Sequence, residues 1–302
     1  MSNNLSNNIN NIFSQFSQSS LNSGWKFSNP FSEEKKTTSN TIISNKNTPI
    51  KSFSYQEDKN LKYRQSMEDT GIMIPDLTSN YKVNLFCILD GHGGSEVVNF
   101  VKERLPELIK NNISNLTPIK ETINNSFNKI DEELKFYDSD YTGCTATLVI
   151  ISDNKIYCGN VGDSKSYLIN NEKVIQISTD HKCTNEEEGI RIKNSGGQII
   201  KNRVMGQLIL SRTLGDLYVK KYGVISTPSI SINNVNNVKF CVIASDGVWD
   251  VIDENSLFIM SQNFKNADLF CKEIVKESLN KGSKDNISCI VISFVELKIF
   301  FF

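Results

Sequence analysis

Three aspartates stand at the ends of apolar runs that are typical of buried strands: Asp90 after residues 85–89, Asp246 after residues 240–244, and Asp285 just before residues 287–294. In antiparallel sheets the end of one strand lies beside the start of its neighbour, so these side chains can meet at one edge. Clustered carboxylates repel one another unless cations neutralise them. Because every ligand would be an oxygen, the expected cation is Mg²⁺ or Mn²⁺. For any single aspartate, a turn or a helix cap is an equally good interpretation, because Asp-Gly is a common turn.

A histidine follows the first of these aspartates in the segment D-G-H-G-G. His92 and His181 are the two histidines of the chain, and neither has a cysteine or a second histidine at zinc-ligand spacing. A histidine beside a leaving group can act as a general acid. The alternative is a hydrogen-bonded surface residue. The glycines do not have the G-x-G-x-x-G spacing of a dinucleotide site.

A third candidate segment is R-Q-S-M-E-D, from Arg64 to Asp69. The planar fork of an arginine fits phosphate oxygens, and Glu68 with Asp69 could hold water bound to a metal. Taken alone, the segment is equally well explained as an exposed charged loop.

The chain has seven cysteines, of which no two form C-x-x-C and most lie in apolar runs. This pattern favours buried thiols in a reducing compartment over disulfides or a zinc site. No cysteine is followed six positions later by an arginine. The sequence therefore argues against a phosphatase that uses a cysteine thiolate as its nucleophile.

Composition excludes several other classes of protein. Basic residues number 33 and acidic residues 34, so the net charge of -1 argues against a nucleic-acid binder. No apolar run reaches the about 20 residues that span a bilayer. The N-terminus resembles no secretory signal, and Ser2 stands where myristoylation requires glycine. We expect a monomer in the cytoplasm or the nucleus.

Two parts of the chain differ in composition. Residues 1–48 are rich in Asn and Ser and show no helical or strand period, which predicts a disordered tail; a phosphorylated regulatory arm is the alternative. Residues 49–302 are expected to form one domain. Their pattern runs strand, two helices, several short strands separated by polar turns, a helix, a strand, two helices (about 253–263 and 266–280) and a final strand. That order favours antiparallel sheets with helices packed outside over a βαβ series.

Several short segments occur in an order that resembles a known family. They are R-x-x-M-E-D (64–69), L-D-G-H-G-G (89–94), T-G-C-T-A (142–146), N-V-G-D-S-K (160–165), D-H-K (180–182), R-V-M-G-Q-L-I-L-S-R-T-L-G-D (203–216), A-S-D-G-V-W-D-V (244–251) and G-S-K-D-N-I-S (282–288). Each segment is weak evidence, but the series is specific. It resembles the metal-dependent protein serine/threonine phosphatases of type 2C, the PPM family, over roughly residues 50–295.

The resemblance implies an α+β fold in four layers, an α-β-β-α sandwich of two antiparallel sheets flanked by helix pairs. It also implies two Mg²⁺ or Mn²⁺ ions, with a weaker third. The implied ligands are Asp90 bridging both ions, the Gly91 carbonyl on one, Asp246 and Asp285 on the other, Glu68 through water, and Asp163 for the third. Arg64 would bind the phosphate, and His92 would protonate the leaving oxygen.

The implied reaction is hydrolysis of phosphoserine and phosphothreonine in phosphoprotein substrates, a signalling activity. Attack by a metal-bridging hydroxide would be direct, without a phosphoenzyme. Two alternatives stay open: a pseudophosphatase that binds phosphoproteins without turnover, and a phosphatase of the same fold acting on small phosphoesters. The separate metallophosphoesterase class would need G-D-x-H-G and G-N-H-E segments, which are absent.

Overall fold

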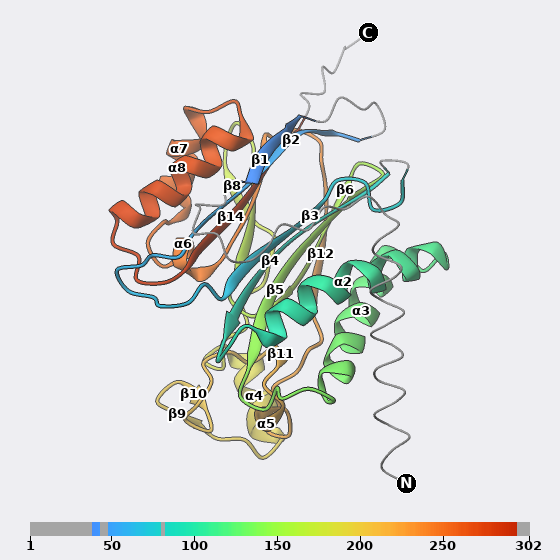
Figure 1. The fold of residues 1–302 in the computed structure, drawn as a ribbon, viewed down its shortest axis with the longest axis vertical. Coiled ribbons are helices and arrows are strands. Elements are labelled where there is room, and N and C mark those ends of the chain that lie inside the picture. Colours follow the sequence, from blue (N-terminus) through green and yellow to red (C-terminus); the bar gives the residue numbers. More distant parts are fainter. Residues whose placement is uncertain (1–37, 43–47, 80–81, 295–302) are drawn as a thin grey trace. The chain divides into compact units, whose positions relative to one another are not determined.

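Two large antiparallel sheets form the centre of the computed structural model, which describes residues 38–42, 48–79 and 82–294 (Figure 1). The first sheet has the strand order β1 (Thr38–Ile42), β2 (Ile50–Asp58), β14 (Ile287–Phe294), β13 (Phe240–Ala244), β7 (Lys165–Ile169) and β8 (Val174–Gln176). The second has the order β12 (Ser229–Asn234), β6 (Lys155–Val161), β5 (Gly143–Ser152), β4 (Val83–His92) and β3 (Asp69–Ile74), with β11 (Leu214–Gly215) also paired to β5.

Helices cover the outer face of each sheet. The helices α2 (Glu96–Ser114) and α3 (Ile119–Leu134) pack on the second sheet. The helices α6 (Asp246–Trp249), α7 (Glu254–Gln262) and α8 (Ala267–Asn280) pack on the first. The predicted four-layer α-β-β-α sandwich is therefore confirmed, and α7 and α8 lie within one residue of the ranges that the sequence indicated.

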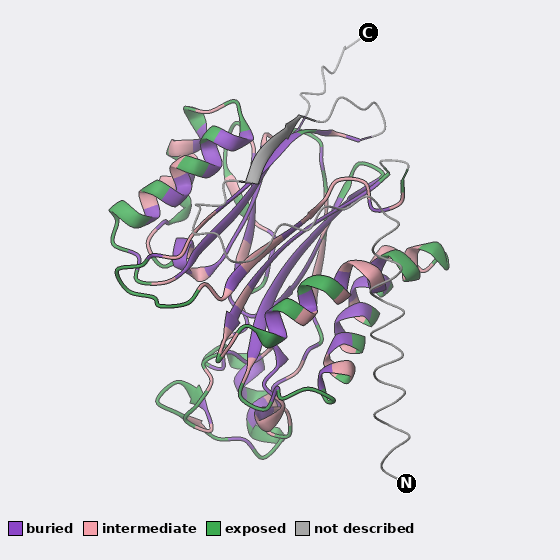
Figure 2. Ribbon diagram, in the orientation of Figure 1, coloured by how far each residue is buried: buried purple, intermediate pink, exposed green. Residues whose placement is uncertain are grey.

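Strand β4 shows why an almost continuous apolar run becomes a central strand. Successive side chains of a strand point to opposite faces. Leu85, Cys87 and Leu89 pack under α2 and α3, whereas Phe86 and Ile88 pack between the two sheets. All five are fully buried, as the purple central strands of Figure 2 show. Burial on both faces fixes the register of β4, because a shift by one residue would exchange the two sets of side chains.

A smaller unit lies beyond the end of β4 and the start of β5 (Figure 1). It comprises α4 (Glu186–Asn194), β9 (Ile199–Ile200), β10 (Arg203–Val204) and α5 (Leu217–Lys220), with a small apolar cluster of its own. An ionic network organises it: the buried carboxylate of Glu188 accepts hydrogen bonds from Arg191 at 2.7 Å, from Arg212 at 2.7 Å and from the Ser211 hydroxyl at 2.5 Å.

Replacing Glu188 with alanine should lower the free energy of unfolding by about 3–5 kcal/mol, because two partly buried arginines would lose their counter-ion. Burial favours the neutral acid, but the hydrogen bonds from Arg191, Arg212 and Ser211 outweigh it and hold the pKa of Glu188 well below its usual range. The stabilisation is therefore complete above the unfolded pKa of about 4.3 and is lost as the pH falls below it. Urea unfolding over a pH series measures both effects.

The matched control is Glu187→Ala, which removes an exposed neighbour on the same helix turn and should change stability by less than about 0.5 kcal/mol. A difference between wild type and Glu188→Ala that stays constant down to pH 3 would contradict the role assigned to the ionised carboxylate.

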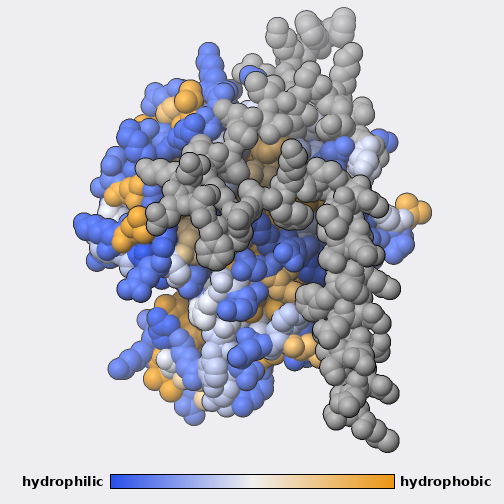
Figure 3. Space-filling model, in the orientation of Figure 1, coloured by the Kyte–Doolittle hydropathy of each residue, from blue (hydrophilic) through white to orange (hydrophobic). Residues whose placement is uncertain are grey.

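Three further sequence predictions concern the periphery. Strand β1 pairs with β2 within residues 1–48, the segment predicted to be a disordered tail; residues 1–37 and 43–47 of that segment lie outside the described part. All seven cysteines are free and buried, as predicted. Among the described residues no helix is long and apolar enough to cross a membrane. On the face shown in Figure 3, apolar side chains form small separate patches.

Candidate active site

Two aspartates face each other where β3 begins and β4 ends. Asp69 and Asp90 are register partners in this antiparallel pair. Side chains directly opposite each other in neighbouring strands lie close together, and like charges there are destabilising. Asp69 is buried and accepts a hydrogen bond from the Ser288 hydroxyl at 2.9 Å. Burial raises the pKa of Asp69 to about 6. Burial, followed by the charges of Asp69 and Asp246, raises the pKa of Asp90 well above its ordinary value.

The first sheet contributes two more carboxylates. Asp246 is the first residue of α6, two positions after the end of β13, and Asp285 lies two positions before the start of β14. Strands β13 and β14 are paired, with Ala244 opposite Cys289, so the end of one strand lies beside the start of the other. Burial and the charges of Asp163 and Asp285 raise the pKa of Asp246 to about 8. The structure thus brings Asp90, Asp246 and Asp285 into one electrostatic neighbourhood.

Cationic side chains hold two of the predicted ligands. Asp285 pairs with the guanidinium of Arg64, and the carboxylate of Asp163 lies 3.1 Å from the ammonium of Lys182. Within residues 48–79 and 82–294, no three His, Cys, Asp or Glu side chains are grouped closely enough to hold a metal ion as they stand. A metal would therefore have to compete with Arg64 for Asp285 and with Lys182 for Asp163.

The chemistry of the donors nonetheless fits a hard divalent cation. Carboxylates and a backbone carbonyl are the ligands of Mg²⁺ and Mn²⁺, and a bound cation would offset the cost of ionising several acids that lie together. The Gly91 position fits as well. Its amide donates to the Glu68 carbonyl at 3.1 Å, and a side chain at residue 91 would crowd that carbonyl at 2.8 Å.

The loop that carries Arg64 and Glu68 is fastened to the loop before β14. Asn286 is buried, and its side chain makes three hydrogen bonds to this loop. The side-chain nitrogen Nδ2 donates to the backbone carbonyls of Lys59 and Ser66 at 2.9 and 3.0 Å, and the side-chain oxygen Oδ1 accepts from the backbone amide of Glu68 at 2.8 Å. Glu68 itself accepts from the Ser66 hydroxyl at 2.9 Å. Asn286 therefore places the predicted phosphate-binding loop beside Asp285, although the two are more than 200 positions apart.

His92 is oriented by a carboxylate that the sequence analysis did not assign. Its Nε2 lies 2.8–2.9 Å from both carboxylate oxygens of Asp216, which is itself buried. Burial of the ring lowers its pKa, but the hydrogen bond to Asp216 and the charges of Asp216 and Glu68 outweigh that effect, so the pKa of His92 lies above its ordinary value. A cationic imidazolium held by a carboxylate is suited to proton donation.

Three residues beside this centre were not predicted from the sequence, although the quoted segments contain them: Asp216, Asp250 and Asn286; Asp69 was considered only together with Glu68 as a holder of metal-bound water. Asp250 adds negative charge that raises the pKa of both Asp246 and Asp285. Each of the three lies within or at the end of a segment that resembles the family. That position was the available signal, but their contacts depend on the packing of separate loops.

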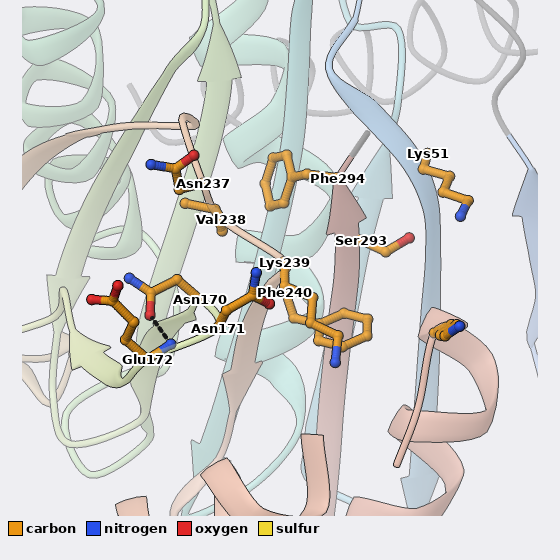
Figure 4. Close-up of a pocket in the computed structure, with 11 residues that line it drawn as sticks. Lys51, Asn170, Asn171, Glu172, Asn237, Val238, Lys239, Phe240, Ser293 and Phe294 are labelled. Atoms are coloured by element: carbon orange, nitrogen blue, oxygen red, sulfur yellow. Dashed lines mark hydrogen bonds between the residues drawn. The ribbon is translucent and has the colours of Figure 1, made fainter. Parts of the chain in front are cut away.

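Two cavities lie at opposite ends of β13 and β14. One of about 230 Å³ is lined by Arg64, Asp250, Lys284 and Asp285, at the acidic centre. Another of about 410 Å³ lies where β13 begins and β14 ends, and Lys51, Lys239 and Asn170 are among its lining residues (Figure 4). The larger cavity contains none of the predicted site residues. Its lysines cannot replace the carboxylates that a metal requires, so the acidic end is the candidate active site.

Comparisons with known proteins show the family of this chain. The sequence profile of the family described as Protein phosphatase 2C matches residues 53–287. Probable protein phosphatase 2C 69 of Arabidopsis thaliana is 32% identical over 253 residues, covering 82% of this chain and 71% of that protein. Protein phosphatase 2C homolog 1 of Saccharomyces cerevisiae is 31% identical over 255 residues, covering 78% of this chain and 91% of that protein.

Solved structures show the same fold. A sex determining protein of C. elegans superposes with a TM-score of 0.75 at 23% identity, covering 82% of this chain and 66% of that chain. Serine-threonine phosphatase 2C from Toxoplasma gondii superposes with a TM-score of 0.69 at 18% identity, covering 82% of this chain and 96% of that chain. The chain belongs to the protein phosphatase 2C family and is a protein serine/threonine phosphatase, a phosphoric monoester hydrolase.

Proposed function

We propose that this phosphatase removes phosphate from phosphoserine and phosphothreonine in proteins by direct attack of water, with Mg²⁺ or Mn²⁺ bound at the acidic centre. The observation that carries the proposal is the convergence of buried and half-buried carboxylates from both sheets, each with a raised pKa. Such a group of like charges is what a divalent cation neutralises.

The proposed ligands are those that the sequence indicated: Asp90, the Gly91 carbonyl, Asp246 and Asp285 for two ions, Glu68 through water, and Asp163 for a weaker third ion. When bound, the ions would neutralise charge on the phosphoryl oxygens and activate a water molecule for attack. Asp69 and Asp250 would add charge that strengthens cation binding without being assigned as ligands.

Two side chains are proposed to act on the substrate directly. Arg64 offers a fork that fits two phosphate oxygens, and it becomes available when a cation takes over its partner Asp285. His92 donates a proton to the departing serine or threonine oxygen. Because Asp216 engages its Nε2, the donating nitrogen is Nδ1. Asp216 is thus a positioning residue, which holds the ring and favours its protonated form.

No phosphoenzyme on sulfur is expected. Cys144 is the cysteine opposite Gly91 in the β4–β5 pair, and it is fully buried. Burial raises the pKa of Cys144 well above its ordinary value, so the reactive thiolate is disfavoured.

The deciding experiment measures phosphate release from a phosphothreonine peptide with Mn²⁺, with Mg²⁺ and after chelation. We expect turnover that depends on added cation and disappears with chelator. Full activity in metal-free buffer would contradict the metal dependence. Binding of the phosphopeptide without phosphate release would indicate a pseudophosphatase, and release from small phosphoesters but not from peptides would indicate the small-molecule alternative.

We also propose that the catalytic domain comprises residues 49–302 and that the protein acts as a monomer in the cytoplasm or the nucleus. The free, buried cysteines support a reducing compartment. Sedimentation analysis of the full chain tests the monomer.

A further inference from the structure

A partly exposed aromatic surface adjoins the loop that follows His92, and we call its residues Tyr141, Tyr218, Tyr222 and Lys221 the tyrosine rim. The rings of Tyr141 and Tyr218 are stacked, with centroids 5.0 Å apart and planes at 30°. Tyr222 meets Tyr218 edge-on at 6.1 Å. The Lys221 ammonium lies 4.8 Å from the Tyr218 centroid and 5.0 Å from that of Tyr222. Tyr141 is nevertheless 63% exposed, so stacking fixes its ring without burying it.

Contacts with the backbone join this rim to the loop that carries His92 and Gly93. Tyr141 precedes Thr142, whose hydroxyl donates to the Gly93 carbonyl at 3.3 Å, and the amide of Asp216 donates to the Thr142 carbonyl at 3.0 Å. A side chain at Gly93 would collide with the carbonyl of Tyr141. The rim therefore begins one residue from the groups that hold Asp216 and, through it, His92.

We propose that the tyrosine rim binds the stretch of phosphoprotein next to the phosphorylated residue and prefers an apolar or aromatic side chain there. This inference rests on the proposed function, because it places the scissile phosphate beside His92. One face of the Tyr141 ring is occupied by Tyr218, which leaves exposed ring surface for an incoming side chain. A ring that is already stacked loses little conformational entropy on binding.

An apolar side chain is favoured over a charged one for a specific reason. Lys221 lies over Tyr218 and Tyr222, so the rim already carries a positive charge that would repel a cationic side chain. Tyr141 therefore contributes contact area rather than charge. Burying one aromatic side chain of the substrate against Tyr141 is expected to raise kcat/KM by about tenfold.

The test compares two phosphothreonine peptides that differ by Phe or Gly at positions adjacent to the phosphothreonine, together with p-nitrophenyl phosphate. The wild type should hydrolyse the Phe peptide with a kcat/KM about tenfold higher than the Gly peptide. Tyr141→Ala should remove most of this preference through a higher KM, and Tyr141→Phe should retain it. The control, Phe136→Ala, removes an aromatic side chain that is 90% exposed outside the rim and should leave the preference intact.

Each outcome has a distinct meaning. A preference that survives Tyr141→Ala, or is absent from the wild type, would overturn the role of the rim while leaving the proposed function standing. A fall in kcat for p-nitrophenyl phosphate as large as the fall for the Phe peptide would show that Tyr141 only supports the loop, which also overturns it. No hydrolysis of either peptide by the wild type would be a failure of the proposed function instead.

Discussion

Replacing Asp246 with alanine is expected to abolish phosphatase activity, by more than about a thousandfold, and to weaken Mn²⁺ binding at the same time. Asp246 opens α6 at the acidic centre, where its pKa of about 8 reflects burial and the charges of Asp163 and Asp285. Loss of this carboxylate would remove both a proposed ligand and the charge that attracts the cation. Phosphate release and calorimetric titration with Mn²⁺ measure the two losses.

The same variant should leave the metal-free protein at least as stable as the wild type. The raised pKa means that the ionised carboxylate of Asp246 is disfavoured by folding, so its removal relieves repulsion. The control is Asp253→Asn, at the exposed N-cap of α7, where asparagine keeps the capping acceptor. Retained Mn²⁺ affinity and turnover in Asp246→Ala would disprove the assigned role.

The second large effect is expected for His92→Ala, which should lower kcat for a phosphothreonine peptide by about 10²–10⁴ while Mn²⁺ binding is retained. The threonine oxygen is a poor leaving group and needs a proton as it departs. p-Nitrophenolate needs none, so hydrolysis of p-nitrophenyl phosphate should fall far less. The ratio of the two effects measures general acid catalysis separately from binding.

Asp216→Asn provides the matched variant, because it keeps the shape of the residue that holds Nε2 but removes its charge. It should show the same leaving-group dependence to a smaller degree. Equal losses for both substrates in His92→Ala would mean that the histidine supports the loop rather than donating a proton.

The strands and the positions of the acids could be predicted because they depend on local patterns. The run that forms β4 is apolar on both faces, so its burial follows from the sequence, although the strand continues past that run through Asp90 to His92. Asp246 and Asp285 adjoin similar runs. Strand pairing then brings the ends together whatever the distance between them along the chain.

The ion pairs could not be predicted, because they join separate loops. Arg64 was expected to bind phosphate, whereas in the structure it pairs with Asp285, and Lys182 pairs with Asp163. Strand β1 was missed for another reason: it joins an edge through backbone hydrogen bonds, which leave no apolar alternation in the sequence. The helices α5 and α6 span only four residues each, too few to show a helical period.

The origin of the carboxylates has a mechanical consequence. Asp90 belongs to the second sheet, whereas Asp246 and Asp285 adjoin strands of the first. Ions bound by carboxylates of both sheets would cross-link the two sheets at one end of the sandwich. Amide hydrogen exchange near that end should therefore slow when cations are added, while the opposite end, around Phe240 and Phe294, keeps its rate.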